Sequence, residues 1–589
     1  MTRRFLPSSF GQFGKFRNLV ILLTTFLAAS RLLPAADLLP GDFQEFGKLA
    51  VQDNGRRKPT DTFARESLLR ITGRSTYEAA DGRRWTPNEF VLSMLLETHD
   101  WKKEPMILVG HRPLVEKLGL DPAQKRYSFE QLSKLPELEK MAKAVHQLRA
   151  TEEKPELDRM QQEVESVSGR IGLFMSIAQG STMLVVPPKL SAKEPWVIPP
   201  QFGVYYKESD FTNATEKLQA MAKGYQSGDG YNFSLGARNL RLALREMSPA
   251  IYPSENALGL EYFYNHLEAF SRAAWLYLIG FIGIAVYAAR PGAPKAFKWI
   301  GLAAALGGLV LHGTGITLRC FIAGRPPVTN MFESVVWVAF LAILFGFFFF
   351  MRYRAALYLL AALPVGALCL ALVLNIPVAM PPNIDPLVPV LRDNFWLTIH
   401  VLSITASYGA FTLAMAFGHI VLFRYAVWPE ATRKDATLHF WNYRIIQLGT
   451  LLLAAGTILG GVWANYSWGR FWGWDPKETW ALIALLCYIV ALHGRIAGWW
   501  NHFGLAMASC VCFLAILMAW YGVNFVLGKG LHSYGFGIGG EGYVASFLVL
   551  DGLFLAFAAY RHLASERARL ARRSGNVAAA KPLDDPATA

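Results

Sequence analysis

Residues 468–480 read WGRFWGWDPKETW, a stretch that combines four tryptophans with two glycines. Indole rings collect where a membrane meets water, and such a belt accounts for one or two of them. Six aromatic residues, however, fall within positions 463–474, and the glycines allow the backbone to approach a flat group closely. The stretch therefore predicts a platform for a planar apolar ligand, with Trp468, Trp472 and Trp474 as its candidate contacts.

The residues that follow the tryptophans predict a helix start. Asp475 as N-cap, Pro476 at the first position and Glu478 at the third form a capping box for a helix that runs to about residue 497. We favour this structural role for the two acids and keep Asp475 among the candidate ligand contacts. The positive end of the helix can also face carboxylates of a ligand. Haem combines a flat apolar ring with carboxylates.

Two histidines are candidate axial ligands of such a haem. His400 lies five residues after Phe395, where an apolar stretch begins, which is about 8 Å along a helix. His532 lies in the loop that follows Phe525. A lone histidine is more often a satisfied polar residue, but two histidines at the level of an aromatic platform favour ligation of the iron.

Other histidines lie deeper in apolar stretches. His493 comes 17 residues after Pro476, or about 26 Å of helix, which carries it to the inner half of a membrane. An ionisable group at that depth is a functional candidate. His493 therefore predicts a second, inner haem site, and His312, near the middle of its stretch, is another such candidate. His419 lies near the inner interface, where headgroups can satisfy it.

The composition explains why these residues need a membrane. The 589-residue chain is 53% hydrophobic and only 17% charged, and its net charge of +14 comes from Lys and Arg spread between apolar stretches rather than gathered in one patch. This distribution argues against nucleic acid as a partner and favours membrane lipid. Nine stretches are long enough to cross a hydrocarbon core of about 30 Å. They lie near 272–290, 297–322, 331–351, 355–378, 395–424, 444–464, 479–497, 503–526 and 543–561.

Basic residues orient these spans. They occupy alternate loops, which are cytoplasmic by the positive-inside bias: Arg290, Lys295, Lys298, Arg352, Arg354, Arg424, Arg433, Lys434, Arg444, Arg495 and the C-terminal tail. The other set of segments then faces outward: 37–270, 323–330, 379–394, 465–478 and 527–542. The prediction is a multi-pass protein of the cytoplasmic (inner) membrane, with the tryptophan stretch on the periplasmic side.

The fold predicted is mainly α, a polytopic helical membrane protein of about ten spans with an N-terminal extracytoplasmic α+β domain. Residues 1–36 form an anchor or a cleaved signal segment, of which we favour the anchor. Residues 37–270 form the soluble domain, 271–562 the membrane domain and 563–589 a cytoplasmic tail. Helix starts are expected in the soluble domain at Thr86 and Ser128, each followed three residues later by an acid or amide.

Cysteine usage excludes two further functions. All five cysteines lie in or beside apolar stretches, and the sequence contains no Cys-x-x-Cys. A thiol oxidoreductase, or a haem held covalently by this chain, would need that motif. The soluble domain shows no catalytic constellation.

The tryptophan stretch resembles the WWD motif of the haem-handling proteins of cytochrome c assembly, and the surrounding pattern is similar to the CcsA (ResC) family of cytochrome c biogenesis system II. The resemblance covers about residues 270–562. It is supported by Gly324-Arg325-Pro326-Pro327, Thr329-Asn330, Glu333-Ser334, Phe395-Trp396-Leu397, Leu492-His493-Gly494-Arg495, Val523-Asn524 and Gly530-Leu531-His532-Ser533-Tyr534.

The resemblance implies haem export and covalent attachment of haem b to the Cys-x-x-Cys-His of an apocytochrome c outside the membrane. It gives His400 and His532 as axial ligands of an outer haem, the tryptophans as its platform and His493 as a ligand of an inner haem. A second inner ligand would come from a CcsB/ResB-like membrane partner or from His312, and we favour the partner. Catalysis by this cytochrome c synthase, or haem lyase, would be mainly positioning, without an acid or base.

Two other functions remain open. A haem transporter or chaperone without ligase activity, as in the system I proteins that also carry WWD, would hand haem to another protein. A structural or signalling membrane protein with aromatic anchors would bind no haem.

Overall fold

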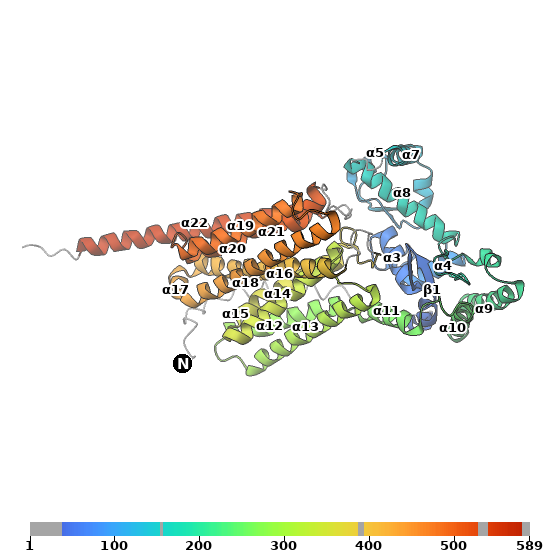
Figure 1. The fold of residues 1–589 in the computed structure, drawn as a ribbon, viewed down its shortest axis with the longest axis horizontal. Coiled ribbons are helices and arrows are strands. Elements are labelled where there is room, and N and C mark those ends of the chain that lie inside the picture. Colours follow the sequence, from blue (N-terminus) through green and yellow to red (C-terminus); the bar gives the residue numbers. More distant parts are fainter. Residues whose placement is uncertain (1–37, 153–156, 387–393, 528–539, 580–589) are drawn as a thin grey trace, which may run out of the picture.

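The computed structural model describes residues 38–152, 157–386, 394–527 and 540–579. A long helical bundle carries a smaller domain at one end (Figure 1). The predicted N-terminal span lies outside the described residues.

The described part of the chain has nine helical segments long and apolar enough to cross a membrane, and each predicted stretch overlaps one of them. In chain order these segments are α11 with α12 (Glu255–Leu267, Ala269–Ala289), α13 (Lys295–Ala323), α14 (Met331–Tyr353), α15 (Leu357–Asn375), α16 (Asn394–Val427), α18 (Ala436–Trp468), α19 (Pro476–Ile496), α20 with α21 and the π-helix η5 (His502–Val511, Phe513–Leu517, Met518–Leu527), and α22 (Glu541–Ala579). The short α17 (Pro429–Lys434) connects α16 to α18.

The N-terminal domain is mostly helical, with three small two-stranded antiparallel sheets. Its strands are β1 (Ala50–Asp53), β2 (Arg56–Pro59), β3 (Tyr77–Glu78), β4 (Arg84–Trp85), β5 (Ile107–Leu108) and β6 (Arg126–Tyr127), which pair as β1–β2, β3–β4 and β5–β6. Its helices are η2 (Pro40–Phe43), α2 (Gln44–Gly47), α3 (Thr60–Thr72), α4 (Pro87–Leu95), α5 (Arg112–Lys117), α6 (Phe129–Ser133), α7 (Pro136–Thr151), α8 (Arg159–Ala178), η3 (Pro199–Val204), α9 (Glu208–Gln226) and α10 (Gly230–Met247).

Local capping chemistry sets the helix starts predicted in this domain. Thr86 begins α4 with Glu89 returning to its backbone N–H at 2.9 Å, and Ser128 begins α6 with Gln131 in the same role. Each capping box satisfies donors that the first turn of a helix leaves unpaired. Both predicted starts are confirmed.

The N-terminal domain contacts one end of the bundle. Gly73 of this domain lies against Val378, which follows α15, and Gly55 lies near Pro386. Arg159 of α8 and Glu541 of α22 form an exposed ion pair, with 3.4 Å between nitrogen and oxygen. The described residues Val378, Pro386 and Glu541, in or beside segments predicted to face outward, therefore lie at the end of the bundle that carries this domain (Figure 1).

A buried charge network ties these loops together. Glu333, in the first turn of α14, accepts from Arg319 Nε at 2.8 Å and from Arg325 Nη1 at 2.9 Å. The two guanidinium groups also donate to the carbonyls of Pro382, Asn383 and Asp385. Arg319 is only 2% exposed and Glu333 only 1%. The network joins the end of α13, the start of α14 and the segment after α15 into one wall, which hereafter we call the Glu333 network.

Candidate haem site

Close packing of α16 on α18 places His400. Gly456 and Gly460 are four residues apart on α18, and a methyl group added at Gly456 would lie only 2.7 Å from the backbone of Ile404 on α16. Small residues at this spacing let two membrane helices approach closely. At Gly460 the added methyl would meet Cε1 of the His400 ring at 2.5 Å. The imidazole thus occupies the space that the glycines leave open.

The His400 ring is held in one tautomer. Its Nδ1 lies 2.8 Å from the carbonyl oxygen of Gly456. Because a carbonyl can only accept, Nδ1 carries the proton and donates, which puts the lone pair on Nε2. Histidines that ligate metals are commonly fixed in this way. Two turns after Gly456 on α18, Trp463 lies parallel to the imidazole, with 6.3 Å between ring centroids and 8° between planes.

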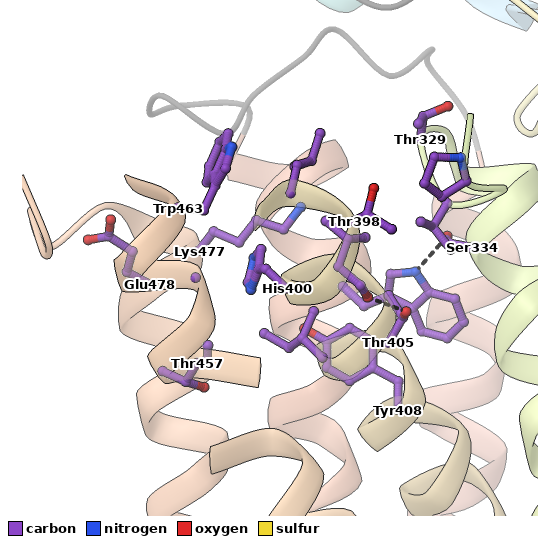
Figure 2. Close-up of a pocket in the computed structure, with 18 of the residues that line it drawn as sticks. Thr329, Ser334, Thr398, His400, Thr405, Tyr408, Thr457, Trp463, Lys477 and Glu478 are labelled. Atoms are coloured by element: carbon purple, nitrogen blue, oxygen red, sulfur yellow. Dashed lines mark hydrogen bonds between the residues drawn. The ribbon is translucent and has the colours of Figure 1, made fainter. Parts of the chain in front are cut away.

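His400 faces a cavity at the end of the bundle near the N-terminal domain (Figure 2). Its wall includes the residues on both sides of Glu333, among them Thr329 and Ser334. The aromatic and ionisable lining residues are His400, Tyr408, Trp463, Phe471, Trp472, Lys477, Glu478 and Trp520. Such a chamber offers flat apolar faces together with a few polar groups, as sites for small ligands do.

The tryptophan stretch contributes one wall, and its three predicted contacts differ in position. Trp472 lines the cavity, whereas Trp468 packs edge-on against Trp463 at 4.7 Å between centroids. Trp474 is 69% exposed, packs edge-on against Trp472 and has a φ of 57°, a left-handed conformation that is rare for a bulky residue. Strained backbone of this kind clusters at functional sites.

Asp475 caps α19 as predicted. Its side chain accepts from the backbone N–H of Lys477 at 3.0 Å, and Glu478 Oε2 accepts from the N–H groups of Asp475 and Gly473. The structural interpretation of the two acids is confirmed. Asp475 is 6% exposed and remains a ligand contact only as a prediction.

The π-helix η5 forms the opposite wall. Trp520 Nε1 donates to Ser334 Oγ at 2.9 Å, and Asn524 lines the cavity one turn later. π-Helices are rare and occur mostly at functional sites. His532 follows the end of η5 by five residues and lies outside the described residues. The sequence did not single out Trp520 as a cavity residue. Its position one helical turn before Asn524, which belongs to the family pattern, is the signal that could have identified it.

The deeper histidines have different surroundings. His493 is exposed near the C-terminal end of α19, with Nδ1 donating to the Ile489 carbonyl at 2.8 Å. His312 is completely buried and is enclosed by the rings of Phe270, Tyr277 and Phe340. The two imidazoles therefore do not face each other.

His419 does not depend on headgroups as its position suggested. Its Nε2 lies 2.6 Å from Asp551 Oδ1 on α22, so a carboxylate within the bundle satisfies it.

The chain is similar in sequence to known proteins. The Cytochrome C assembly protein family matches residues 328–532, which contain most of the cavity wall. CcsA of Guillardia theta is 35% identical over 243 residues, covering 37% of this chain and 79% of that protein. CcsA of Prochlorococcus marinus (strain MIT 9313) is 31% identical over 330 residues, covering 50% of this chain and 98% of that protein.

The chain belongs to the CcsA family of cytochrome c biogenesis proteins. It is thus a multi-pass membrane protein of a family that handles haem. Protein NrfI of Wolinella succinogenes is 31% identical over 539 residues, covering 86% of this chain, more than the membrane domain alone can supply. The chain spans 57% of the length of NrfI. The N-terminal domain is therefore shared, at least in part, with a relative larger than the CcsA proteins.

Replacing Gly460 with alanine is expected to lower the amount of haem that the protein retains through His400. The added methyl would overlap the imidazole and push it away from the Gly456 carbonyl, and loss of such an orienting bond typically costs 10–100-fold in metal affinity. Haem content per protein, read from the Soret band of purified protein, measures the effect. Gly552→Ala is the control, because a methyl at that helical glycine meets nothing within 4 Å. Equal haem content in the two variants would contradict the close approach of Gly460 to the His400 ring.

Proposed function

We propose that the cavity holds a haem whose iron is ligated by His400 and His532, and that the protein attaches this haem b to the Cys-x-x-Cys-His of an apocytochrome c. The observation that carries the proposal is the imidazole of His400, whose lone-pair nitrogen is fixed beside a parallel indole in an aromatic cavity. A ring ligated through two imidazoles against aromatic walls is oriented without being enclosed.

The protein's part in this reaction is positioning. Each thioether forms when a cysteine S–H adds across a vinyl C=C of haem, with sulfur joining one carbon and hydrogen the other, so no atom is lost. The chain must hold the ring still, keep a vinyl edge open to two thiols and exclude competing ligands. Acid–base side chains are not needed for that role.

The end of the bundle that carries the N-terminal domain is proposed to face the periplasm. The support is the set of basic loops at the opposite end, which the positive-inside bias assigns to the cytoplasm. The N-terminal domain would then lie where an apocytochrome c arrives, beside the mouth of the cavity. Docking of that polypeptide or of a partner is its proposed role.

The inner haem site is proposed to use His493 together with a ligand from a CcsB/ResB-like membrane partner. His493 is exposed on the outer surface of the bundle, where a second protein can reach it. His312, the alternative ligand, lies on α13 and is enclosed by aromatic rings on α12 and α14, so the partner is favoured.

Co-expression with an apocytochrome c, in a bacterial host that lacks its own assembly pathway, separates ligation from transport. A synthase is expected to yield cytochrome that keeps its haem stain after denaturing electrophoresis, because the haem is covalently bound. The candidate CcsB/ResB-like partner is supplied in one arm and omitted in the other. Haem-loaded membrane protein with no covalent cytochrome in either arm would refute the ligase activity and favour a transporter or chaperone.

A further inference from the structure

The cavity contains a lysine whose ammonium forms no salt bridge in the described part of the chain. Lys477 lies in the first turn of α19, within the tryptophan stretch and three residues after Trp474. Figure 2 shows its side chain running from the helix into the cavity that the His400 ring also faces. The other titratable groups that line the cavity are His400, Tyr408 and Glu478.

The nearby carboxylates accept hydrogen bonds from backbone N–H groups rather than from the Lys477 ammonium. Asp475 accepts from the backbone N–H of Lys477, and Glu478 Oε2 accepts from two backbone N–H groups in its capping role. The hydrogen bond seen for the Lys477 ammonium goes to the amide oxygen of Asn524, at 3.5 Å. Within the described ranges, Lys477 forms no salt bridge.

An ammonium in an apolar cavity is costly unless an anion accompanies it. The start of α19 adds partial positive charge to the same region, since its first N–H groups point toward the N-terminal end of the helix. Both features favour a ligand that brings its own negative charge. Neither is needed to bind the iron or to stack a ring.

We propose that Lys477 binds a propionate carboxylate of the haem in this cavity, an inference that rests on the proposed function. In haem the two propionates share one edge of the porphyrin, and the vinyl groups lie toward the other edges. An ion pair at Lys477 therefore selects which edge enters the cavity and which edge faces the incoming thiols. Lys477 is thus a specificity-determining residue for the orientation of the substrate.

The test compares two porphyrins on the purified full-length protein in detergent. Iron protoporphyrin IX carries both carboxylates, whereas its dimethyl ester has the same ring, iron and vinyl groups without the charges. Binding is followed by the change in the Soret band, and the contribution of this cavity is the part of the signal that His400→Ala removes. We expect the wild type to bind the free acid roughly tenfold more tightly than the ester, as for a charge-assisted hydrogen bond.

The Lys477→Gln variant is expected to bind the free acid only as tightly as it binds the ester. Its affinity for the ester should stay close to that of the wild type. Lys434→Gln, an exposed lysine of α17 at the opposite end of the bundle, serves as control and should keep the wild-type preference (Figure 1). A merely structural role for Lys477 would weaken both porphyrins alike.

The outcomes separate the two proposals. A wild type without preference for the free acid, or a Lys477→Gln variant that keeps it, overturns the assignment of Lys477 while leaving the haem site intact. No His400-dependent signal with either porphyrin overturns the proposed function and this inference with it.

Discussion

His400→Ala is expected to remove most of the haem from the cavity and to reduce covalent cytochrome c formation at least tenfold. The imidazole supplies the lone pair on Nε2, and alanine leaves the Gly456 carbonyl and the face of Trp463 with no metal donor between them. Loss of a ligand should cost no less than loss of the bond that orients it, about 10–100-fold. The Soret absorbance of purified protein and the haem stain of co-expressed cytochrome measure the two effects.

Added imidazole should partly restore both signals, because a free imidazole can enter the space that the side chain vacates. His146→Ala, an exposed histidine of α7, controls for general effects of removing a histidine. Full haem content in His400→Ala would show that the iron is held elsewhere. Failure of imidazole to restore activity, with a normal thermal unfolding midpoint, would indicate that His400 acts in another way.

The membrane fold could be predicted from sequence because each span is determined locally. A run of about 20 apolar residues must form a helix in lipid, where only intrasegment hydrogen bonds satisfy the backbone. All nine predicted stretches overlap helical segments of the described structure for that reason. Capping residues act over three or four positions, so the starts of α4, α6 and α19 could also be predicted from the sequence.

The cavity depends on contacts between distant segments, and these were only partly predictable. His400 and the tryptophan stretch were found because their chemistry is unusual for a membrane helix. The bond from His400 to Gly456 joins residues 56 positions apart, and Trp520 meets Ser334 across 186 positions. No local periodicity encodes such pairs. The spacing of Gly456 and Gly460 was a usable signal for close helix packing, although not for which helix packs there.

The tryptophans show the same limit. Their clustering predicts a shared role, yet Trp472 lines the cavity, Trp468 packs against Trp463 and Trp474 is exposed. The turn after α18 sets these directions, with Gly469 at a φ of 71° and Trp474 at 57°. Backbone conformations of that kind send neighbouring side chains to different sides. Composition alone does not reveal which side each indole takes.

The Glu333 network has the largest expected effect on stability. One carboxylate faces two guanidinium groups in a region almost without solvent, and it also accepts from the backbone and hydroxyl of Thr329 at 2.9 and 2.8 Å. Removing one partner of a buried ion pair costs about 3–5 kcal/mol, because the remaining charge stays buried and unbalanced. Here two arginines would lose their counter-ion at once. Thr329 and Ser334, on either side of Glu333, line the cavity, so the wall would loosen as well.

Glu333→Ala is therefore expected to lower the thermal unfolding midpoint of the purified protein markedly and to reduce haem content in parallel. Glu430→Ala provides the matched control, since Glu430 pairs with Arg433 at 2.7 Å but has a side chain that is 60% exposed. Arg433 is itself only 13% exposed, but it keeps a second carboxylate partner, Glu566 at 2.8 Å, so this variant should unfold close to the wild type. Similar midpoints for the two variants would mean that carbonyl oxygens alone neutralise Arg319 and Arg325. Haem loss with an unchanged unfolding midpoint would instead mean that Glu333 affects haem binding directly and not through the stability of the protein.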